Sequence, residues 1–191
     1  MALQEDSRPI VQTNVETPLG VFQLFATASG LRRVQFPANV VRDAVNIPPT
    51  LFTEREESDI PRSVADQIPI VNTHDAAHTL QHAQTWLLAY FRRAPLPSLP
   101  PLDLSWCTRF GQSVYRQLIA VPPGAVTTYG ELAREISCAG AARAVGSWMK
   151  KNQLPLFIPC HRVLPQNGSA GGWSGPEGLK EWLLAHERNM F

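Results

Sequence analysis

A short proline-rich segment near the middle of the chain constrains the fold more than any other feature. Residues 94–101 contain four prolines, and they separate two stretches of helical periodicity. Proline fixes its own φ and cannot donate a backbone hydrogen bond, so this segment predicts a stiff connection. A chain of 191 residues is long enough for two small domains. We therefore expect a supporting domain over residues 1–98 and a second domain over residues 99–191.

The first domain is expected to combine a small antiparallel sheet with one helix. Two runs of strand-forming residues, 21–26 and 31–36, are separated by a turn at Gly30. Residues 76–91 place apolar side chains at helical spacing. The intervening residues 37–73 are rich in proline and acidic residues, which predicts a long connection.

The second domain is expected to be mainly helical, which makes the whole chain an α+β protein. Residues 110–120 show helical periodicity and end before a Pro-Pro-Gly sequence. Thr128 is followed three residues later by Glu131, which predicts a capping box at the start of a short helix. A four-residue turn then leads to a helix over residues 141–151, and this pair predicts a helix-turn-helix. A final helix is expected over about residues 177–188.

Pairs of short helices also occur in proteins that never bind DNA, so the outer face of the second helix is informative. That face has no acidic residue and carries Arg143, Ser147, Lys150 and Lys151. Its first turns hold mostly small residues, which would let the helix backbone approach a groove closely. Residues 1–105 have a net charge of −3 and the remaining residues a net charge of +4. The second half is therefore the half expected to bind nucleic acid.

One cysteine has neighbours that a structural cysteine does not need. Cys160 lies directly before a histidine and an arginine in the run Pro-Cys-His-Arg-Val at residues 159–163. The thiolate is the nucleophilic form, and nearby cationic or basic groups are expected to lower its pKa from about 8.5. Cys107 and Cys138 lack such neighbours and are expected to be packing residues. Three widely spaced cysteines predict no disulfide framework and a reducing compartment.

This motif and its surroundings resemble the O6-alkylguanine-DNA alkyltransferase family of suicide DNA-repair proteins. The resemblance is carried by the Pro-Cys-His-Arg-Val run, by Asn152 before it, by Gly-Trp-Ser-Gly at residues 172–175 and by Leu-Leu-Ala-His-Glu at residues 183–187. It implies irreversible transfer of an alkyl group from O6-alkylguanine in double-stranded DNA to Cys160. It also implies minor-groove binding through the helix-turn-helix and flipping of the damaged base. O4-alkylthymine is left open as a second substrate.

The resemblance assigns roles to the residues around the thiol. His161 would remove the proton from Cys160 through a bound water, and Glu187 would hold His161, which is the logic of a triad. Asn152 would tie the helix-turn-helix to the active-site loop. Arg162 would be mainly structural and would bond nearby carbonyls.

The residues expected to contact the DNA or the flipped base are Tyr129, Arg143, Val163, Ser174, Trp173, Thr128 and Ser147. Tyr129 would donate a hydrogen bond that helps guanine leave, and Arg143 would fill the space that the extruded base leaves. Val163 and Ser174 would contact the base through backbone atoms. Trp173 stands where tyrosine is frequent in the family and would narrow or reshape the pocket for larger alkyl groups.

No cofactor and no metal are expected. His74, His78 and His82 share one helix face at a spacing that can bind zinc, but the nearby carboxylate is only Asp75 and residues 1–105 contain no cysteine. An exposed polar face is therefore expected there. No apolar run approaches a membrane span and the N-terminus is polar, so we expect no signal peptide and no membrane contact. We expect a monomer in the cytoplasm, or in the nucleus of a eukaryotic cell, with cooperation between molecules on DNA left open.

Other functions explain the sequence less completely. A non-catalytic protein that binds alkylated DNA would share the fold, but such proteins typically carry tryptophan in place of Cys160. A cysteine hydrolase usually takes its histidine from a distant part of the chain, and a helix-turn-helix regulator would leave the cysteine motif unexplained. Suicide alkyl transfer is therefore the preferred function, and lesion binding without transfer is the alternative.

Overall fold

The computed structural model describes residues 9–37, 75–166, 173, 175–188 and 190. Its N-terminal part is an antiparallel sheet of strand order β1-β2-β3, with β1 at Val11–Thr17, β2 at Gly20–Thr27 and β3 at Gly30–Gln35. The two strands expected from the sequence are confirmed as β2 and β3, whereas β1 was not expected. Val15 is the one residue of β1 classed as buried, so this edge strand has only a weak alternating pattern. Apart from its first residue, the connection expected over residues 37–73 lies outside the described residues.

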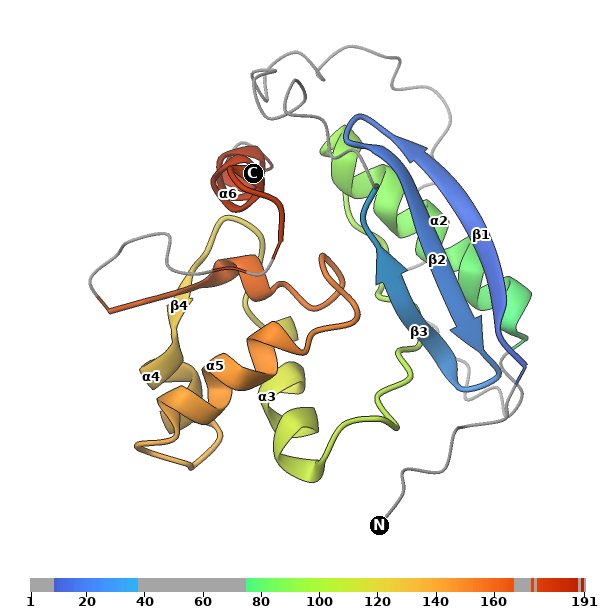
Figure 1. The fold of residues 1–191 in the computed structure, drawn as a ribbon. Helices are drawn as coiled ribbons and strands as arrows, with labels where there is room; N and C mark the ends of the chain where they lie inside the picture. The colour runs from blue at the N-terminus through green and yellow to red at the C-terminus, as the bar shows by residue number, and fades with distance from the viewer. Residues whose placement is uncertain (1–8, 38–74, 167–172, 174, 189, 191) are drawn as a thin grey trace.

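Helix α2 (Ala76–Arg92) covers one face of this sheet (Figure 1). It begins at the N-cap Asp75, whose side chain accepts a hydrogen bond from the backbone N–H of Ala77. Its buried face contains Leu80, Ala83, Trp86, Leu87, Tyr90 and Phe91. The helix predicted for residues 76–91 is therefore confirmed, and it packs as its apolar spacing requires.

The proline-rich segment runs along the free edge of β3. The Leu31 N–H donates to the Pro101 carbonyl at 2.7 Å, and the Asp103 N–H donates to the Leu31 carbonyl at 2.9 Å. A Cβ at Gly30 would lie 2.6 Å from the Pro101 oxygen, so only glycine allows this close approach. The connection between the two halves is therefore attached to the sheet along part of its length.

The C-terminal part is mainly helical, as expected. It contains α3 (Arg109–Ile119), α4 (Tyr129–Glu135), α5 (Ala142–Lys150) and α6 (Leu179–Arg188). Two short strands, β4 (Thr127–Thr128) and β5 (Val163–Leu164), pair in parallel. The structure thus confirms the α+β class, with helices gathered on the side away from the sheet (Figure 1).

Helices α4 and α5 form the expected pair of short helices joined by a turn. The Thr128 hydroxyl accepts from the Glu131 N–H, and the Glu131 carboxylate accepts from the Thr128 N–H, which confirms the capping box. The turn reverses through Ser137 and Gly140, which both have positive φ. Helix α3 packs on this pair through Gly111, which faces the ring of Trp148.

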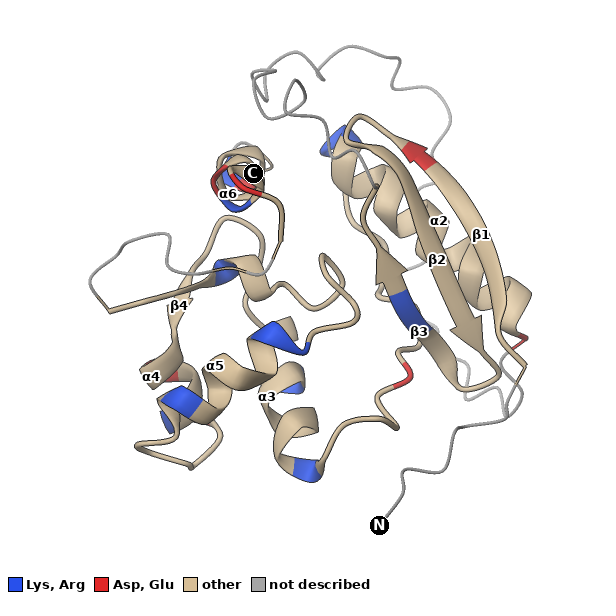
Figure 2. Cartoon of the chain, viewed as in Figure 1, with Lys and Arg blue, Asp and Glu red and all other residues tan. Residues whose placement is uncertain are grey.

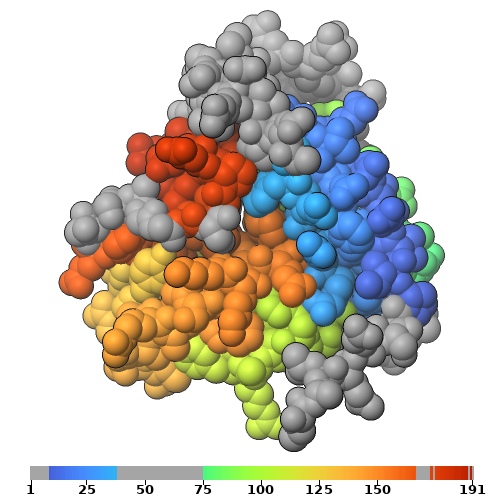
Figure 3. Space-filling view, in the orientation of Figure 1, coloured from blue at the N-terminus to red at the C-terminus, as the bar shows by residue number. Residues whose placement is uncertain are grey.

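The two halves meet around the residues that lead to Cys160. The Val34 N–H of β3 donates to the Gln153 carbonyl at 2.8 Å, and the Arg32 guanidinium donates to the Gln153 side chain at 3.0 Å. In the space-filling view the residues of β3 lie against this segment (Figure 3). In the part of the chain that the structure describes, no helix is long and apolar enough to cross a membrane.

We predict that Gly111→Ala destabilises the fold by about 1–3 kcal/mol, because the added methyl group would overpack the α3–α5 contact. Its Cβ would lie 2.7 Å from the Trp148 ring. The free energy of unfolding from urea titration measures the effect.

The matched control is Gly130→Ala in α4, whose Cβ would meet no atom within 4 Å. This variant should keep or slightly raise stability, by up to about 1 kcal/mol, since alanine favours helix over glycine. Equal stability of the two variants would contradict the packing argument.

Candidate functional site

The segment before Cys160 is held in place by one asparagine. The Asn152 side-chain amide donates to the Ile158 carbonyl at 2.8 Å, and its side-chain oxygen accepts from the Leu154 N–H at 2.9 Å. Residues 154–163 are all buried. The chain then forms a single 3₁₀ turn, η2 (Cys160–Arg162), which begins with the thiol. Asn152 thus bonds both sides of the loop, in the manner expected from the sequence.

The Cys160 thiol is almost completely buried, with 5% of the residue exposed. Burial raises its pKa, and the hydrogen bond from Trp173, the Asn152 side chain and the charge of Lys180 oppose this rise only in part. The indole N–H of Trp173 donates to Sγ at 3.3 Å. The expected net lowering of the thiol pKa is therefore wrong, because burial outweighs the effect of the nearby groups. The side chains next to Cys160 in sequence bind Glu187 instead, and the thiol remains protonated at neutral pH.

His161 and Glu187 form a buried pair beside the thiol. Nε2 of His161 lies 2.7 Å from Oε1 of Glu187, and both residues are at most 1% exposed. Burial opposes ionisation of Glu187, but hydrogen bonds from His161 and Arg162 outweigh it and hold the pKa of the carboxyl well below its usual range. Burial lowers the pKa of His161, so the ring is neutral. The neutral ring therefore donates through Nε2–H, which leaves the lone pair of Nδ1 available to accept a proton.

Three further donors complete the surroundings of the Glu187 carboxylate. Arg162 donates Nε to Oε2 and Nη2 to Oε1, both at 2.9 Å, and its Nη1 donates to the Val121 carbonyl at 2.6 Å. The Gly124 N–H donates to Oε2 at 3.3 Å. The Tyr90 hydroxyl, from α2 in the other half of the chain, donates to Oε1 at 2.7 Å. Arg162 thus binds a carbonyl as expected, and in addition holds the carboxylate.

Two residues of this site were not singled out from the sequence. Tyr90 was expected only as part of the apolar stripe of α2, where its hydroxyl gives no sequence signal. Lys180 is buried, and its Nζ donates to the Val163 carbonyl at 2.9 Å. Lys180 lies seven residues before Glu187, hence on the same face of α6, and this spacing was the available signal.

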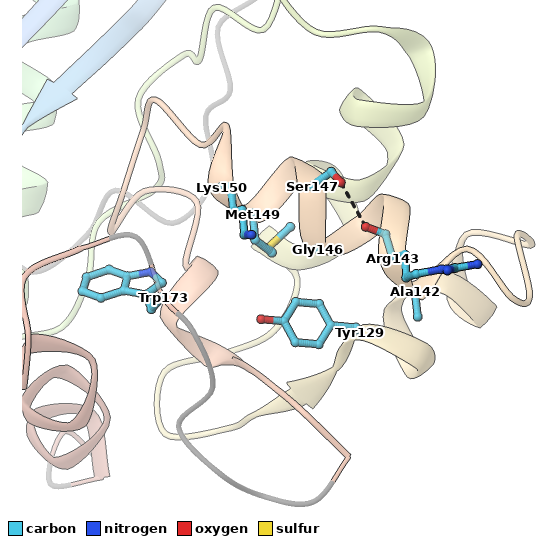
Figure 4. Close-up of a pocket in the computed structure, with 8 residues that line it drawn as sticks. All are labelled: Tyr129, Ala142, Arg143, Gly146, Ser147, Met149, Lys150 and Trp173. Atoms are coloured by element: carbon cyan, nitrogen blue, oxygen red, sulfur yellow. Dashed lines mark hydrogen bonds between the residues drawn. The ribbon is translucent and has the colours of Figure 1, made fainter.

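A cavity of about 400 Å³ lies between α4, α5 and Trp173 (Figure 4). Its lining residues are Tyr129, Ala142, Arg143, Gly146, Ser147, Met149, Lys150 and Trp173. The Tyr129 ring projects into it, whereas the Arg143 side chain extends away from Trp173 (Figure 4). Burial and the nearby Cys160 raise the pKa of Tyr129, so its hydroxyl stays a proton donor at neutral pH.

A second cavity, of about 200 Å³, is also lined by Trp173 and reaches Cys160. Arg33, Gln35 and Phe36, which lie in β3 or directly after it, form one wall of this cavity. The Phe36 and Trp173 rings meet edge to face, with centroids 6.0 Å apart. Trp173 therefore lines both cavities while its N–H contacts the sulfur.

The remaining residues expected to bind DNA differ in their exposure. Ser147 is exposed and its hydroxyl donates to the Arg143 carbonyl, and the Thr128 hydroxyl caps α4. Val163 is buried in β5, beside Thr127 of β4. Ser174 lies outside the described residues. The structure thus gathers Cys160 and its partners in the interior and leaves Arg143, Ser147 and Lys150 of α5 at the surface.

The surface of α5 is basic. Arg143 and Lys150 are exposed within it, and Lys151 follows it with its ammonium group 5.1 Å from the Trp148 ring centroid. Figure 2 shows Lys and Arg at both ends of this helix and no acidic residue within it. In the α2 face considered for zinc, His82 Nε2 lies 2.9 Å from the Ser98 carbonyl. The described residues contain no group of three potential metal ligands.

Comparison with known proteins identifies the family. A profile described as "6-O-methylguanine DNA methyltransferase, DNA binding domain" matches residues 109–189. The methylated-DNA–protein-cysteine methyltransferase of Cricetulus griseus is 34% identical over 184 residues, which cover 92% of this chain and 80% of that protein. The chain belongs to the methylated-DNA–protein-cysteine methyltransferase family. The resemblance inferred from the sequence is therefore confirmed.

Other members of the methyltransferase family agree in sequence and in fold. The Homo sapiens methylated-DNA–protein-cysteine methyltransferase is 32% identical over 186 residues, covering 92% of this chain and 79% of that protein. The crystal structure of Mycobacterium tuberculosis OGT in complex with DNA superimposes with a TM-score of 0.67 at 26% identity. It covers 93% of this chain and 92% of that chain. The likeness therefore extends over both halves of the fold.

We predict that Trp173→Phe shifts Cys160 reactivity to higher pH, by roughly half a unit to one unit, because the thiolate loses a hydrogen-bond donor. The measurement is the rate of Cys160 modification by iodoacetamide as a function of pH, read by peptide mass spectrometry. Phe36→Leu is the control, since it changes the cavity wall and keeps the indole donor. An unchanged pH curve in Trp173→Phe would contradict the role of the N–H···S contact.

We predict that Glu187 makes stability depend on pH in the acid range. Its folded pKa is depressed, so its contribution is present above the ordinary carboxyl pKa of 4.5 and is lost as pH falls further. Glu187→Gln should lose about 3–5 kcal/mol at pH 7, because Arg162 is left without its carboxylate. Urea unfolding between pH 7 and pH 3 should show this difference narrowing below pH 4.5. Glu181→Gln, on the exposed face of the same helix, is the control, and its free energy of unfolding should match that of the unmodified protein at each pH.

Proposed function

We propose that this protein repairs DNA by transferring the alkyl group of O6-alkylguanine in double-stranded DNA irreversibly to Cys160. The observation that carries the proposal is the buried thiol beside a neutral imidazole whose Nε2–H is held by Glu187. The printed names of the Cricetulus griseus and Homo sapiens relatives agree with a methyl transfer from DNA to a protein cysteine. The Mycobacterium tuberculosis protein of the same fold was crystallised in complex with DNA.

The first step is removal of the thiol proton. Because burial raises the pKa of Cys160, the sulfur needs a base. Nδ1 of His161 is buried and makes no hydrogen bond to any described residue, so it is the acceptor that the site offers. The proton passes to it through a water molecule, as the family resemblance implies. Trp173 then stabilises the thiolate through its N–H.

The second step is displacement at the alkyl carbon. The thiolate sulfur of Cys160 forms a bond to that carbon while the bond from the carbon to O6 breaks, and the electron pair stays on guanine. The Tyr129 hydroxyl donates a proton to the leaving guanine, and the proton that His161 took from Cys160 returns to Tyr129 through solvent. Thiol and O6-alkylguanine thus become thioether and guanine. A thioether resists hydrolysis, so one protein molecule would repair one lesion.

The helix-turn-helix is proposed to present α5 to the minor groove. Its outer face is basic, and the small residue Gly146 in its middle lets the backbone approach closely. The alkyl carbon is out of reach inside a duplex, so the damaged base would be flipped into the cavity beside Tyr129. Arg143 lines that cavity with its side chain extending away from Trp173, and it is proposed to fill the space left in the stack.

The other DNA and base contacts are proposed for Thr128, Ser147, Val163, Ser174 and Trp173. Asn152 is proposed to keep the loop that carries Cys160 aligned with α5. Residues 99–191 would form the alkyl-transfer domain and residues 1–98 its support. We expect a monomer that acts where chromosomal DNA is found, in the cytoplasm or the nucleus. The same proposal leaves two points open: whether O4-alkylthymine is a second substrate, and whether protein molecules cooperate on DNA.

We predict a single added methyl group on the Cys160 peptide after incubation with a duplex that contains one O6-methylguanine. Intact and peptide mass spectrometry should show one adduct per protein molecule and no turnover when the DNA is in excess. Cys160→Ala should bind the same duplex and show no adduct. Lesion binding without any adduct in the unmodified protein would instead support the alternative, a non-catalytic protein that recognises alkylated DNA.

A further inference from the structure

The Tyr90 hydroxyl reaches the proposed proton-accepting pair from the opposite half of the chain. Tyr90 lies in the last two turns of α2, is fully buried, and is 97 positions from Glu187 in sequence. Its Oη donates to Oε1 of Glu187 at 2.7 Å. The same oxygen accepts from His161 Nε2 at 2.7 Å. Tyr90 and His161 therefore share one acceptor atom.

We infer that Tyr90 is a positioning residue for alkyl transfer, which sets the orientation of the Glu187 carboxylate toward His161. The inference rests on the proposed function, since it names a further residue that serves the same site. Tyr90 itself does not touch Cys160 through any contact that the structure records. Its effect on the thiol would pass through Glu187 and then His161.

The position of Tyr90 is fixed independently of its hydroxyl. Nε2 of His186 lies 2.9 Å from the Tyr90 backbone carbonyl, so the neutral ring donates to it. The Tyr90 ring stacks on Trp86 with centroids 5.5 Å apart. Two consecutive residues of α6 thus bind Tyr90, one at its backbone and one at its hydroxyl. The phenol can therefore hold the carboxylate without moving itself.

The raised pKa of Tyr90 makes its hydroxyl the donor in the hydrogen bond to Glu187. Burial, together with the charge of Glu187, raises the pKa of Tyr90 well above its ordinary value. The hydroxyl therefore keeps its proton at neutral pH. It withdraws electron density from Oε1, which moderates the basicity of the oxygen that holds His161.

Removing this hydroxyl is expected to raise two pKa values, that of Glu187 and that of His161. Glu187 loses a donor that favours its ionised form, so its pKa rises. Oε1 also becomes a stronger acceptor for His161, so the imidazole retains a proton at higher pH. The titratable and charged groups that interact with the carboxylate are Tyr90, His161, Arg162 and His186, while Lys180 acts on His161 and Arg93 acts on His186. Both consequences move the acid limb of the alkyl-transfer rate to higher pH.

The test is Tyr90→Phe in the full-length protein. We expect transfer from O6-methylguanine duplex to be roughly threefold to tenfold slower at pH 7. We also expect the acid limb of the rate against pH to move upward by about half a unit. Modification of Cys160 by iodoacetamide should show the same upward shift without any DNA. Affinity for the duplex should be unchanged, because α5 is not involved.

The matched control is Tyr115→Phe, which also deletes one buried phenol hydrogen bond, from Tyr115 Oη to the Trp148 carbonyl at 2.7 Å. This variant loses comparable stability but should keep the pH profile of iodoacetamide modification. The inference would be overturned if the pH profile of Tyr90→Phe coincided with that of the unmodified protein. It would also be overturned if the profiles of Tyr90→Phe and Tyr115→Phe shifted by the same amount. No methyl transfer by the unmodified protein would instead overturn the proposed function, and the iodoacetamide profile would still test Tyr90.

Discussion

The buried carboxylate of Glu187 is the group on which the geometry of the site depends. Moving a carboxylate out of water carries a desolvation penalty of several kcal/mol, on the order of the whole stability margin of a small domain. Glu187 nevertheless stays ionised, because Tyr90, Gly124, His161 and Arg162 all donate to it. These donors come from α2, from the loop before β4 and from η2. One side chain of α6 thus fixes three other segments relative to each other.

This arrangement explains why the N-terminal half contributes to the site although it lacks the nucleophile. Helix α2 supplies Tyr90, and β3 binds the loop before Cys160 through the hydrogen bond from Val34 to Gln153. The loop is therefore bounded by the sheet on one side and by the helix-turn-helix on the other. Buried residues of both halves belong to one continuous core. The proline-rich segment marks a change in composition, and its hydrogen bonds to Leu31 keep it against the sheet.

Local sequence patterns predicted those features that depend only on residues close together in the chain. The bounds of α2, the capping box at Thr128 and the two-helix turn follow from spacing and side-chain chemistry within a few residues, and the structure agrees. Strand β1 was not predicted, because an edge strand with one side chain classed as buried has little alternation. The contacts of Tyr90 and the pKa of Cys160 were also not predicted. Both depend on burial and on partners far away in sequence, which the spacing of residues along the chain does not reveal.

The raised pKa of Cys160 fits a protein that can react only once. A thiol that rests protonated reacts slowly with chance electrophiles, because the thiolate is the nucleophile. Loss of the proton to His161 would create the thiolate beside Trp173, which also lines the cavity where the base is proposed to enter. Trp173 contributes both to the protection of the resting thiol and to the stability of the thiolate. Its ring packs beside Sγ, and its N–H stabilises the negative charge once that charge forms. Tyrosine, with its donor at the tip of the ring instead of on its edge, would have to approach the sulfur from another direction. The substitution therefore changes how the thiolate is stabilised and leaves the reacting groups themselves intact.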